Sequence, residues 1–243
     1  MVESNEDSYW EMGLLHKEDW QAYWVTQPWP NELEKSSPCP YFRKIFDINK
    51  PIKRARIYTS ALGLYELEIN GRKVGSEVFT PGWTNYHKRL QYQVYDITDQ
   101  IVVGGNVVGA ILGDGWYRGH YGWWANNRNT YGEKLALLLQ LELVYEDGSK
   151  ELILTDESWK ASTGPILKSD IYNGETYDAR LEHNGWSSVG FDESDWQKVK
   201  ILKHPKDMLA ESIGEKVKKI MKLSTASLTT TPKGEKVYDL GQN

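Results

Sequence analysis

The stretch Leu64-Tyr65-Glu66-Leu67-Glu68-Ile69-Asn70-Gly71 decides the fold class of this chain. In its first six residues, apolar and polar side chains alternate, as they do in a strand with one buried and one solvated face. Asn-Gly is the dipeptide that two-residue hairpin turns favour, because both of its positions then have a positive φ. Lys73-Val74-Gly75 continues the chain after the turn, so this stretch predicts a β-hairpin.

Short strands separated by turn residues extend on both sides of this hairpin. Arg56–Thr59 alternates before it, and Leu90–Tyr95 alternates after it. Asn106–Leu112 is a denser apolar run, which is typical of a strand buried on both faces. A second hairpin is predicted from Leu135–Tyr145 to Lys150–Thr155, because an Asp-Gly pair lies between these two runs.

These patterns span about residues 41–202, without the alternation of strands and helices that indicates a parallel sheet. We therefore predict an all-β fold, an antiparallel β-sandwich or jelly roll. Gly113-Asp114-Gly115 lacks the spacing of a phosphate-binding loop, so no nucleotide site is predicted. The sandwich is assigned to residues 41–203, with a short entry or linker segment at 1–40 before it.

Residues 204–243 are assigned to a linker and the truncated start of a following β-domain. Within the flanks, Lys17–Tyr23 predicts one or two helical turns, and Met208–Lys222 fits either a helix or a linker that leads into a new strand. Thr229–Asn243 predicts a turn and the opening strand of another β-domain. We therefore expect the chain to be a piece of a larger protein.

Composition narrows the class of protein. The net charge of −5 argues against a nucleic-acid partner, and apolar runs such as Leu135–Leu139 are too short to span a membrane. The single Cys39 excludes an internal disulfide framework and a thiolate zinc cluster. The sequence begins with acidic residues where a signal peptide would have basic ones. A cytoplasmic, a periplasmic and a secreted parent protein all remain open.

The aromatic residues are biased toward rings with a polar edge. Eleven Trp and fifteen Tyr stand against four Phe. Such rings can bury a face and still form a hydrogen bond, and stacking on a sugar ring uses that combination. A sandwich core built from Trp and Tyr is the alternative interpretation.

Several segments form an ordered set along nearly the whole chain. They are Trp10–Leu15, Asp19-Trp20, Trp24, Tyr65–Gly71, Pro81–Tyr86, Arg89, Tyr92, Tyr95–Thr98, Gly113–Gly119, Tyr131-Gly132, Gly174–Arg180, Trp186, Phe191–Trp196 and Tyr238–Asn243. The set resembles the N-terminal β-sandwich region of bacterial α-L-rhamnosidases, glycoside hydrolase family 78. The last segment resembles the first strand of the next β-domain in those enzymes.

The resemblance implies that this chain is a non-catalytic part of a hydrolase. Enzymes of this family remove terminal α-L-rhamnose from glycosides and polysaccharides with inversion, and their catalytic carboxylates lie in an (α/α)6 barrel that follows the β-domains. Nothing in this sequence predicts that barrel. We therefore expect no catalytic residue in this chain, and no hydrolysis by it alone.

The resemblance also implies the partners. In some members the N-terminal sandwich binds rhamnose through calcium, and in others it only braces the barrel. A carbohydrate-binding-like accessory domain would contact L-rhamnose-containing glycans and the catalytic barrel. A purely structural module without a ligand is the alternative. No cofactor is required in either case, although calcium remains a candidate.

Acidic residues gather near the aromatic ones at Glu175 and Asp178, next to Asp170. An inverting glycosidase needs two carboxyl groups with room for a water between them. We favour a structural network instead, in which Arg180 clamps a carboxylate and fixes the loop between two strands. A contact with the barrel is the remaining interpretation.

Two connections hold the candidate ligand-binding residues. The first follows the Pro81-Gly82 turn, and the second is the long connection from Gly113 to Gly132, which is rich in Trp, Tyr and Asn. The candidates are Trp83, Asn85, Tyr86, Asp114, Trp123, Trp124, Asn127, Asn129 and Tyr131. Trp116 and Tyr117 end an apolar strand, so core or inter-domain packing is favoured for them.

The residues within these connections differ in what they predict. Trp123 and Trp124 face opposite ways in an extended chain, so one of them is expected to be exposed and able to stack on a sugar. Asn127 and Asn129 are the candidate calcium ligands, with turn residues of positive φ as the alternative. Asn85 stands where many relatives of the family are expected to have aspartate. The loss of that negative charge would weaken a calcium site.

Overall fold

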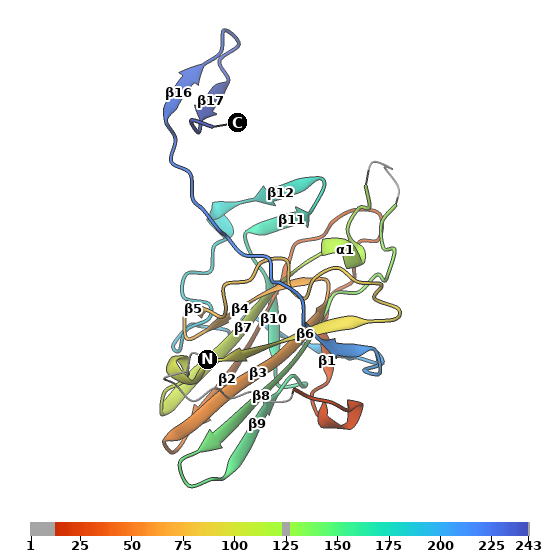
Figure 1. Cartoon of the computed structure of the whole chain (residues 1–243), viewed down its shortest axis with the longest axis vertical. Helices are drawn as coiled ribbons and strands as arrows, with labels where there is room; N and C mark the ends of the chain where they lie inside the picture. The colour runs from red at the N-terminus through yellow and green to blue at the C-terminus, as the bar shows by residue number, and fades with distance from the viewer. Residues whose placement is uncertain (1–12, 123–126, 243) are drawn as a thin grey trace, which may run out of the picture.

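Two facing β-sheets form the body of the chain, and the computed structural model describes residues 13–122 and 127–242. Figure 1 shows the strands of both sheets in the lower part of the molecule. The first sheet contains, in spatial order, β14 (Lys200–Leu202), β1 (Trp24–Thr26), β8 (Ala136–Tyr145), β3 (Ile52–Leu62), β6 (Leu90–Asp96) and β15 (Leu209–Glu211), with β9 (Lys150–Leu154) also paired to β8.

The second sheet contains β13 (Gln197–Lys198), β10 (Lys160–Thr163), β2 (Pro40–Ile48), β7 (Gly104–Gly113), β4 (Leu64–Ile69) and β5 (Arg72–Lys73). Pairing is antiparallel in both sheets except between β15 and β6, which run parallel. The predicted all-β antiparallel sandwich is therefore confirmed. The helices are short: η1 (Lys17–Asp19), η2 (Thr98–Gln100), α1 (Gly115–Arg118) and η3 (Ala179–Leu181).

Both predicted hairpins are present. Asn70 and Gly71 connect β4 to β5 with φ values of 50° and 79°. The Asp147-Gly148 turn connects β8 to β9, and the φ of Gly148 is 81°. The dense apolar run is the centre of β7, where Asn106–Ala110 is fully buried between β2 and β4.

The main core lies between the two sheets and contains inward side chains such as Phe42, Ile57, Leu67, Val108 and Leu139. The outer face of each sheet is also covered. On the first sheet, Trp20, Trp24 and Tyr86 pack with Tyr58 and Leu138. On the second sheet, Trp186 and Trp196 pack with Tyr41. Many of the Trp and Tyr residues are thus core residues, as the alternative interpretation of the composition held.

Segments from both flanks join the sandwich. β1 lies within residues 1–40 and pairs with β14 and β8, and β15 lies within 204–243 and pairs with β6. The segment Met208–Lys222 thus contains a strand rather than a helix. The domain boundaries themselves stay a prediction.

Two further hairpins complete the chain. β11 (Ile166–Asp170) pairs with β12 (Gly174–Tyr177), and β16 (Ser227–Thr230) pairs with β17 (Lys236–Asp239). Figure 1 shows the β16–β17 hairpin set apart from the sandwich at the C-terminal end. Over residues 13–122 and 127–242, no helix has the length and apolar character needed to cross a membrane.

Candidate functional site

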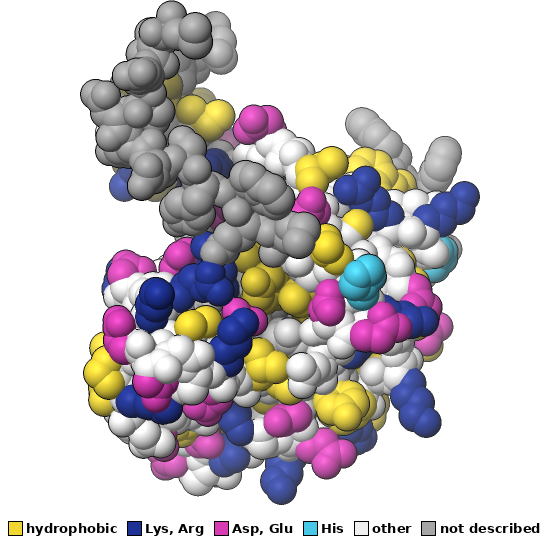
Figure 2. All heavy atoms as spheres, turned by 60° about the horizontal axis from the view of Figure 1, so that its bottom comes forward, with side chains coloured by type: hydrophobic (Ala, Val, Ile, Leu, Met, Phe, Trp, Pro, Cys, Tyr) yellow, Lys and Arg dark blue, Asp and Glu magenta, His cyan; other side chains and the backbone are white. Residues whose placement is uncertain are grey.

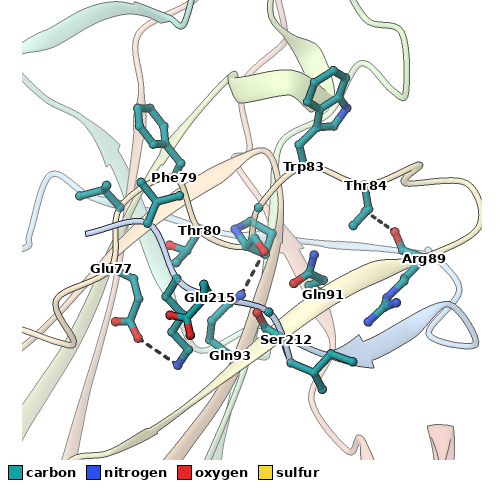
Figure 3. Close-up of a pocket in the computed structure, with 17 residues that line it drawn as sticks. Glu77, Phe79, Thr80, Trp83, Thr84, Arg89, Gln91, Gln93, Ser212 and Glu215 are labelled. Atoms are coloured by element: carbon teal, nitrogen blue, oxygen red, sulfur yellow. Dashed lines mark hydrogen bonds and ion pairs between the residues drawn. The ribbon is translucent and has the colours of Figure 1, made fainter. Parts of the chain in front are cut away.

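A cleft of about 420 Å³ lies between the connection that precedes β6 and the chain that follows β15. One wall is the loop 77–84, and the opposite wall is the segment 212–217. Figure 3 shows Gln91 and Gln93 of β6 lying between these two walls. The volume falls within the range of about 300–1,000 Å³ that is typical of small-molecule sites.

Two contacts hold the walls of the cleft together. The backbone N–H of Val78 donates to the carbonyl of Val217 at 2.9 Å, and Lys216 Nζ lies 3.0 Å from Glu77 Oε1. Burial by itself raises the pKa of Glu77, but hydrogen bonds from Lys216 and from backbone N–H groups outweigh burial and hold that pKa below its usual value. Glu77 is therefore an ionised partner of Lys216.

Four aromatic side chains form a cluster at one end of the cleft: Phe79, Trp83, Trp116 and Tyr121. Trp83 stacks on Trp116 with ring centroids 5.8 Å apart and planes 8° apart. The ring centroid of Phe79 lies 5.8 Å from that of Trp116. Tyr121 packs edge-on against Trp83, with ring centroids 5.4 Å apart. Trp83 remains 51% exposed, so the aromatic cluster presents ring surface to solvent.

The polar side chains of the cleft differ in the hydrogen bonds that they form within the protein. Gln93 donates to the carbonyl of Pro81 at 3.0 Å and accepts from the hydroxyl of Tyr65 at 2.7 Å. It therefore fixes the loop. Arg89 is exposed, and its guanidinium donates to the carbonyl of Glu211 at 3.4 Å. Arg89 and Gln91 thus offer donors and acceptors to a molecule bound in the cleft.

The other two candidates of the first connection have structural contacts. Tyr86 is buried, donates its hydroxyl to the carbonyl of Gly82 at 2.8 Å and packs against Tyr117. The side chain of Asn85 accepts from the backbone of His87 at 3.2 Å, and its carbonyl accepts from Lys88 and Arg89. Asn85 therefore forms the turn that leads into β6. The structure brings neither side chain into the cleft.

Asp114 is the centre of a buried ionic cluster. Its carboxylate accepts from Arg128 at 3.0 Å and from Ser36 at 2.6 Å, and lies 3.5 Å from the guanidinium of Arg118. Arg118 in turn donates to the carbonyl of Glu32 and to Ser37. This cluster joins the loop after α1 to the segment before β2, so Asp114 acts on the position of that loop.

The remaining candidates of the second connection lie on this loop. Asn127 is exposed, and Asn129 has the positive φ of 57° that the turn interpretation requires. The amide nitrogen of Asn129 donates to the carbonyl of Leu33 at 2.9 Å. Tyr131 packs on Tyr86 with centroids 5.0 Å apart. Trp123 and Trp124 lie outside the described residues.

The calcium site stays a prediction. In the described part of the chain, no three His, Cys, Asp or Glu residues come close enough to hold a metal ion. The Oδ1 atom of Asn129 is buried and has no hydrogen-bond partner among those residues. One such oxygen offers a ligand but not the set of six to eight oxygens that calcium takes.

Among the acidic residues near Glu175, Asp178 forms an ion pair with the exposed Arg180. Arg180 donates to Asp178 through Nε at 2.8 Å and Nη2 at 2.5 Å. Glu175 lies on β12, where it lines a second cavity rather than meeting Arg180. Asp170 is buried and accepts from the backbone and the ring of His120 at 2.9 and 2.7 Å. Arg180 thus binds the carboxylate of Asp178 but not that of Glu175.

Trp116 and Tyr117 lie on α1 with different surroundings. Tyr117 is buried and packs edge-on against Tyr86 at 5.4 Å. Trp116 is half-buried behind Trp83 in the aromatic cluster. Packing is thus their main contact in this structure.

Sequence reasoning missed Phe79, Gln91 and the segment 212–217 as parts of the site. Phe79 could have been noticed as an apolar ring within a loop rather than within an alternating strand. No local signal identifies the segment 212–217, because its place beside residues 77–84 depends on long-range pairing of β15 with β6.

The charge on the surface is mixed. Figure 2 shows acidic and basic side chains interspersed over the face that it presents, with hydrophobic side chains between them. A mixed field of this kind differs from the basic face of a nucleic-acid-binding protein.

Comparisons with known proteins give a consistent result. A family model described as the alpha-L-rhamnosidase N-terminal domain matches residues 50–221. An α-L-rhamnosidase of Streptomyces avermitilis is 42% identical over 242 residues, which cover 98% of this chain and 23% of that protein. One from Formosa agariphila is 40% identical over 200 residues, which cover 78% of this chain and 21% of that protein.

Solved structures agree with these matches. The native α-L-rhamnosidase from Aspergillus terreus is 42% identical and superposes with a TM-score of 0.92, over 96% of this chain and 27% of its own. The Streptomyces avermitilis enzyme complexed with L-rhamnose is 41% identical, with a TM-score of 0.81 over 86% of this chain and 20% of its own. The chain thus spans about a quarter of the length of these relatives.

Proposed function

This chain belongs to the family of α-L-rhamnosidase N-terminal domains, and from that premise we propose that it is a non-catalytic accessory domain that binds rhamnose-containing glycans. The parent enzyme of the proposal hydrolyses terminal α-L-rhamnose from glycosides or polysaccharides with inversion. The accessory domain holds the glycan in the cleft between residues 77–84 and 212–217. Its second partner is the catalytic part of the same enzyme.

The shape of the cleft carries this proposal. A surface that serves only for packing is expected to be flat, whereas a ligand site is concave and has a few convergent polar groups. The cleft is concave, with the half-exposed Trp83 at one end and Arg89 and Gln91 within reach. An aromatic face can take the C–H side of a sugar, and the polar side chains can take its hydroxyl groups.

Glu77 is one of two acidic residues that line the cleft, the other being Glu215, and its ionisation state supports a non-catalytic role. The general acid of a glycosidase has a raised pKa, so that it keeps a proton near neutral pH. Glu77 has a lowered pKa and is paired with Lys216. It is therefore suited to hold the cleft walls together rather than to protonate a leaving group.

A purely structural role is the second candidate, and one observation favours it. Large apolar side chains are exposed along the segment after β15, with Ile213 at 76%, Ile220 at 95% and Met221 at 74%. Side chains of this kind commonly mark a surface that packs against another body. In this alternative the domain braces the catalytic barrel and binds no sugar.

A ligand-dependent melting experiment separates the two candidates. L-Rhamnose at ten times its Kd should stabilise the domain by about 1.4 kcal/mol, which raises the Tm by about 3–6 °C for a chain of this size. Trp83→Ala should abolish the rise, whereas Tyr238→Ala, which removes an exposed ring on β17, should preserve it. The titration is run with and without calcium.

Two results would contradict the proposal. An unchanged Tm across millimolar L-rhamnose, in both calcium conditions, would leave the structural role. Measurable turnover of an aryl α-L-rhamnoside by this chain would contradict the non-catalytic role.

A further inference from the structure

A second cavity of about 320 Å³ adjoins the first, and both are lined by Val78 and Phe79. The second cavity lies between the end of the second sheet and the β11–β12 hairpin. Its other lining includes the side chains of Leu64, Ser169 and Glu175. Val78 and Phe79 therefore stand between two concave sites.

The backbone of Phe79 is strained. Its φ is 60°, in the left-handed region that bulky residues rarely adopt. Such a conformation persists only where the surrounding structure enforces it, and it is enriched at ligand sites. A glycine would remove the strain at this position, yet the chain has a phenylalanine whose side chain is 47% exposed.

The residues on both sides enforce this conformation. Val78 donates its N–H to Val217 at 2.9 Å. Thr80 accepts from the N–H of Tyr65 at 2.9 Å and donates its hydroxyl to the carbonyl of Tyr65 at 2.8 Å. The loop is thus fixed to the segment 212–217 on one side and to β4 on the other. This fixes the position of the Phe79 ring in the wall between the cavities.

The ring of Phe79 also belongs to the aromatic cluster. It meets Trp116 at 5.8 Å with planes at 55°. Figure 3 shows the rings of Phe79 and Trp83 rising from the same loop on the same side of the cleft. Both cavities therefore have an aromatic ring at their boundary. Each has polar groups as well, Arg89 and Gln91 in the first and Ser169 and Glu175 in the second.

We propose that the two cavities are adjacent subsites for a glycan of at least two sugar rings, with Phe79 as the residue that determines this length specificity. The inference rests on the proposed function, because it takes the first cavity as the rhamnose site. Each ring of the glycan fills one cavity, and the linkage crosses the edge of Phe79. Hydroxyl groups of the second ring meet the carboxylate of Glu175 and the hydroxyl of Ser169.

Calorimetric titration with two probes tests this length specificity. The probes are L-rhamnose and the α-linked disaccharide of two L-rhamnose units. The wild-type chain should bind the disaccharide about tenfold more tightly, the scale of one aromatic contact. Phe79→Ala should remove this preference, so that both probes bind with the same affinity. Phe79→Tyr, which retains the ring, should keep the tenfold preference.

A third variant separates binding from folding. Phe79→Gly also removes the ring but relieves the strain, so its Tm should exceed that of Phe79→Ala while its disaccharide affinity is equally low. Equal affinity of the wild-type chain for both probes would overturn the length specificity and leave the proposed function intact. A preference for the disaccharide that persists in Phe79→Ala and Phe79→Gly would overturn it too. Binding of neither probe by the wild-type chain would overturn both.

Discussion

Trp83 and Trp116 stack almost parallel, with planes 8° apart and centroids separated by 5.8 Å. Trp83 lies on the loop before β6, and Trp116 lies on α1 after β7. The stack therefore joins two connections that each run from the second sheet to the first. Trp116 packs against one face of the Trp83 indole and leaves the other face available to a sugar.

A double-mutant cycle measures this support. Trp83→Ala, Trp116→Ala and the double variant should show a coupling free energy of about 0.5–1.5 kcal/mol in urea unfolding, the usual value for aromatic pairs. Trp116→Ala should also weaken L-rhamnose binding, because the indole of Trp83 loses its fixed orientation. Coupling within error of zero would mean that the two rings are independent.

The buried cluster at Asp114 should dominate the stability of the loop after α1. Asp114→Asn leaves the guanidinium groups of Arg118 and Arg128 buried without their counter-charge, at a cost of about 3–5 kcal/mol. Asp178→Asn is the matched control, because it breaks an ion pair with the exposed Arg180. We expect no measurable change in its unfolding free energy. Similar losses in both variants would argue against the ionic cluster.

Gly109 of β7 lies against the indole of Trp186 on the outer face of the second sheet. A Cβ at Gly109 would lie 2.4 Å from Trp186 Cζ3, whereas one at Gly105 on the same strand would meet nothing nearer than 3.5 Å. Gly109→Ala should therefore displace Trp186 and cost about 1–3 kcal/mol. Gly105→Ala should be tolerated. Urea unfolding of both variants tests the difference.

The stability of the domain should depend on pH through His204. Burial first, and the charge of His87 second, lower the pKa of His204 below its usual value of 6.5. The unfolded chain then binds a proton more readily than the folded chain, so stability is fully present above pH 6.5 and falls as pH decreases through the folded pKa.

His204→Phe removes this titration and can retain the edge-on contact with Trp24, whose ring centroid lies 5.6 Å away. The variant should lose less unfolding free energy than the wild-type chain between neutral and mildly acidic pH. Urea unfolding measured across that range provides the comparison. Parallel pH profiles for the two proteins would exclude His204 as the source.

The hairpins and the sandwich were predictable because their signals are local. Asn70 and Gly71 adopt a positive φ for reasons contained in the dipeptide, and the alternation in Leu64–Ile69 specifies which side chains face the core. The candidate loops were predictable as connections. Their individual residues were not: Tyr86 and Asp114 are buried, whereas Trp83, on the same connection as Tyr86, is exposed.

By itself, the sequence determined the all-β class and the positions of the turns, since both depend on residues near one another in the chain. It also determined the family, through an ordered set of short segments. Only the tertiary structure decided where a ligand could bind. The cleft needs residues 77–84 and 212–217 side by side, held by the Glu77–Lys216 pair and the parallel contact of β15 with β6. Pairing across so long a stretch depends on the packed sandwich, which no local pattern records.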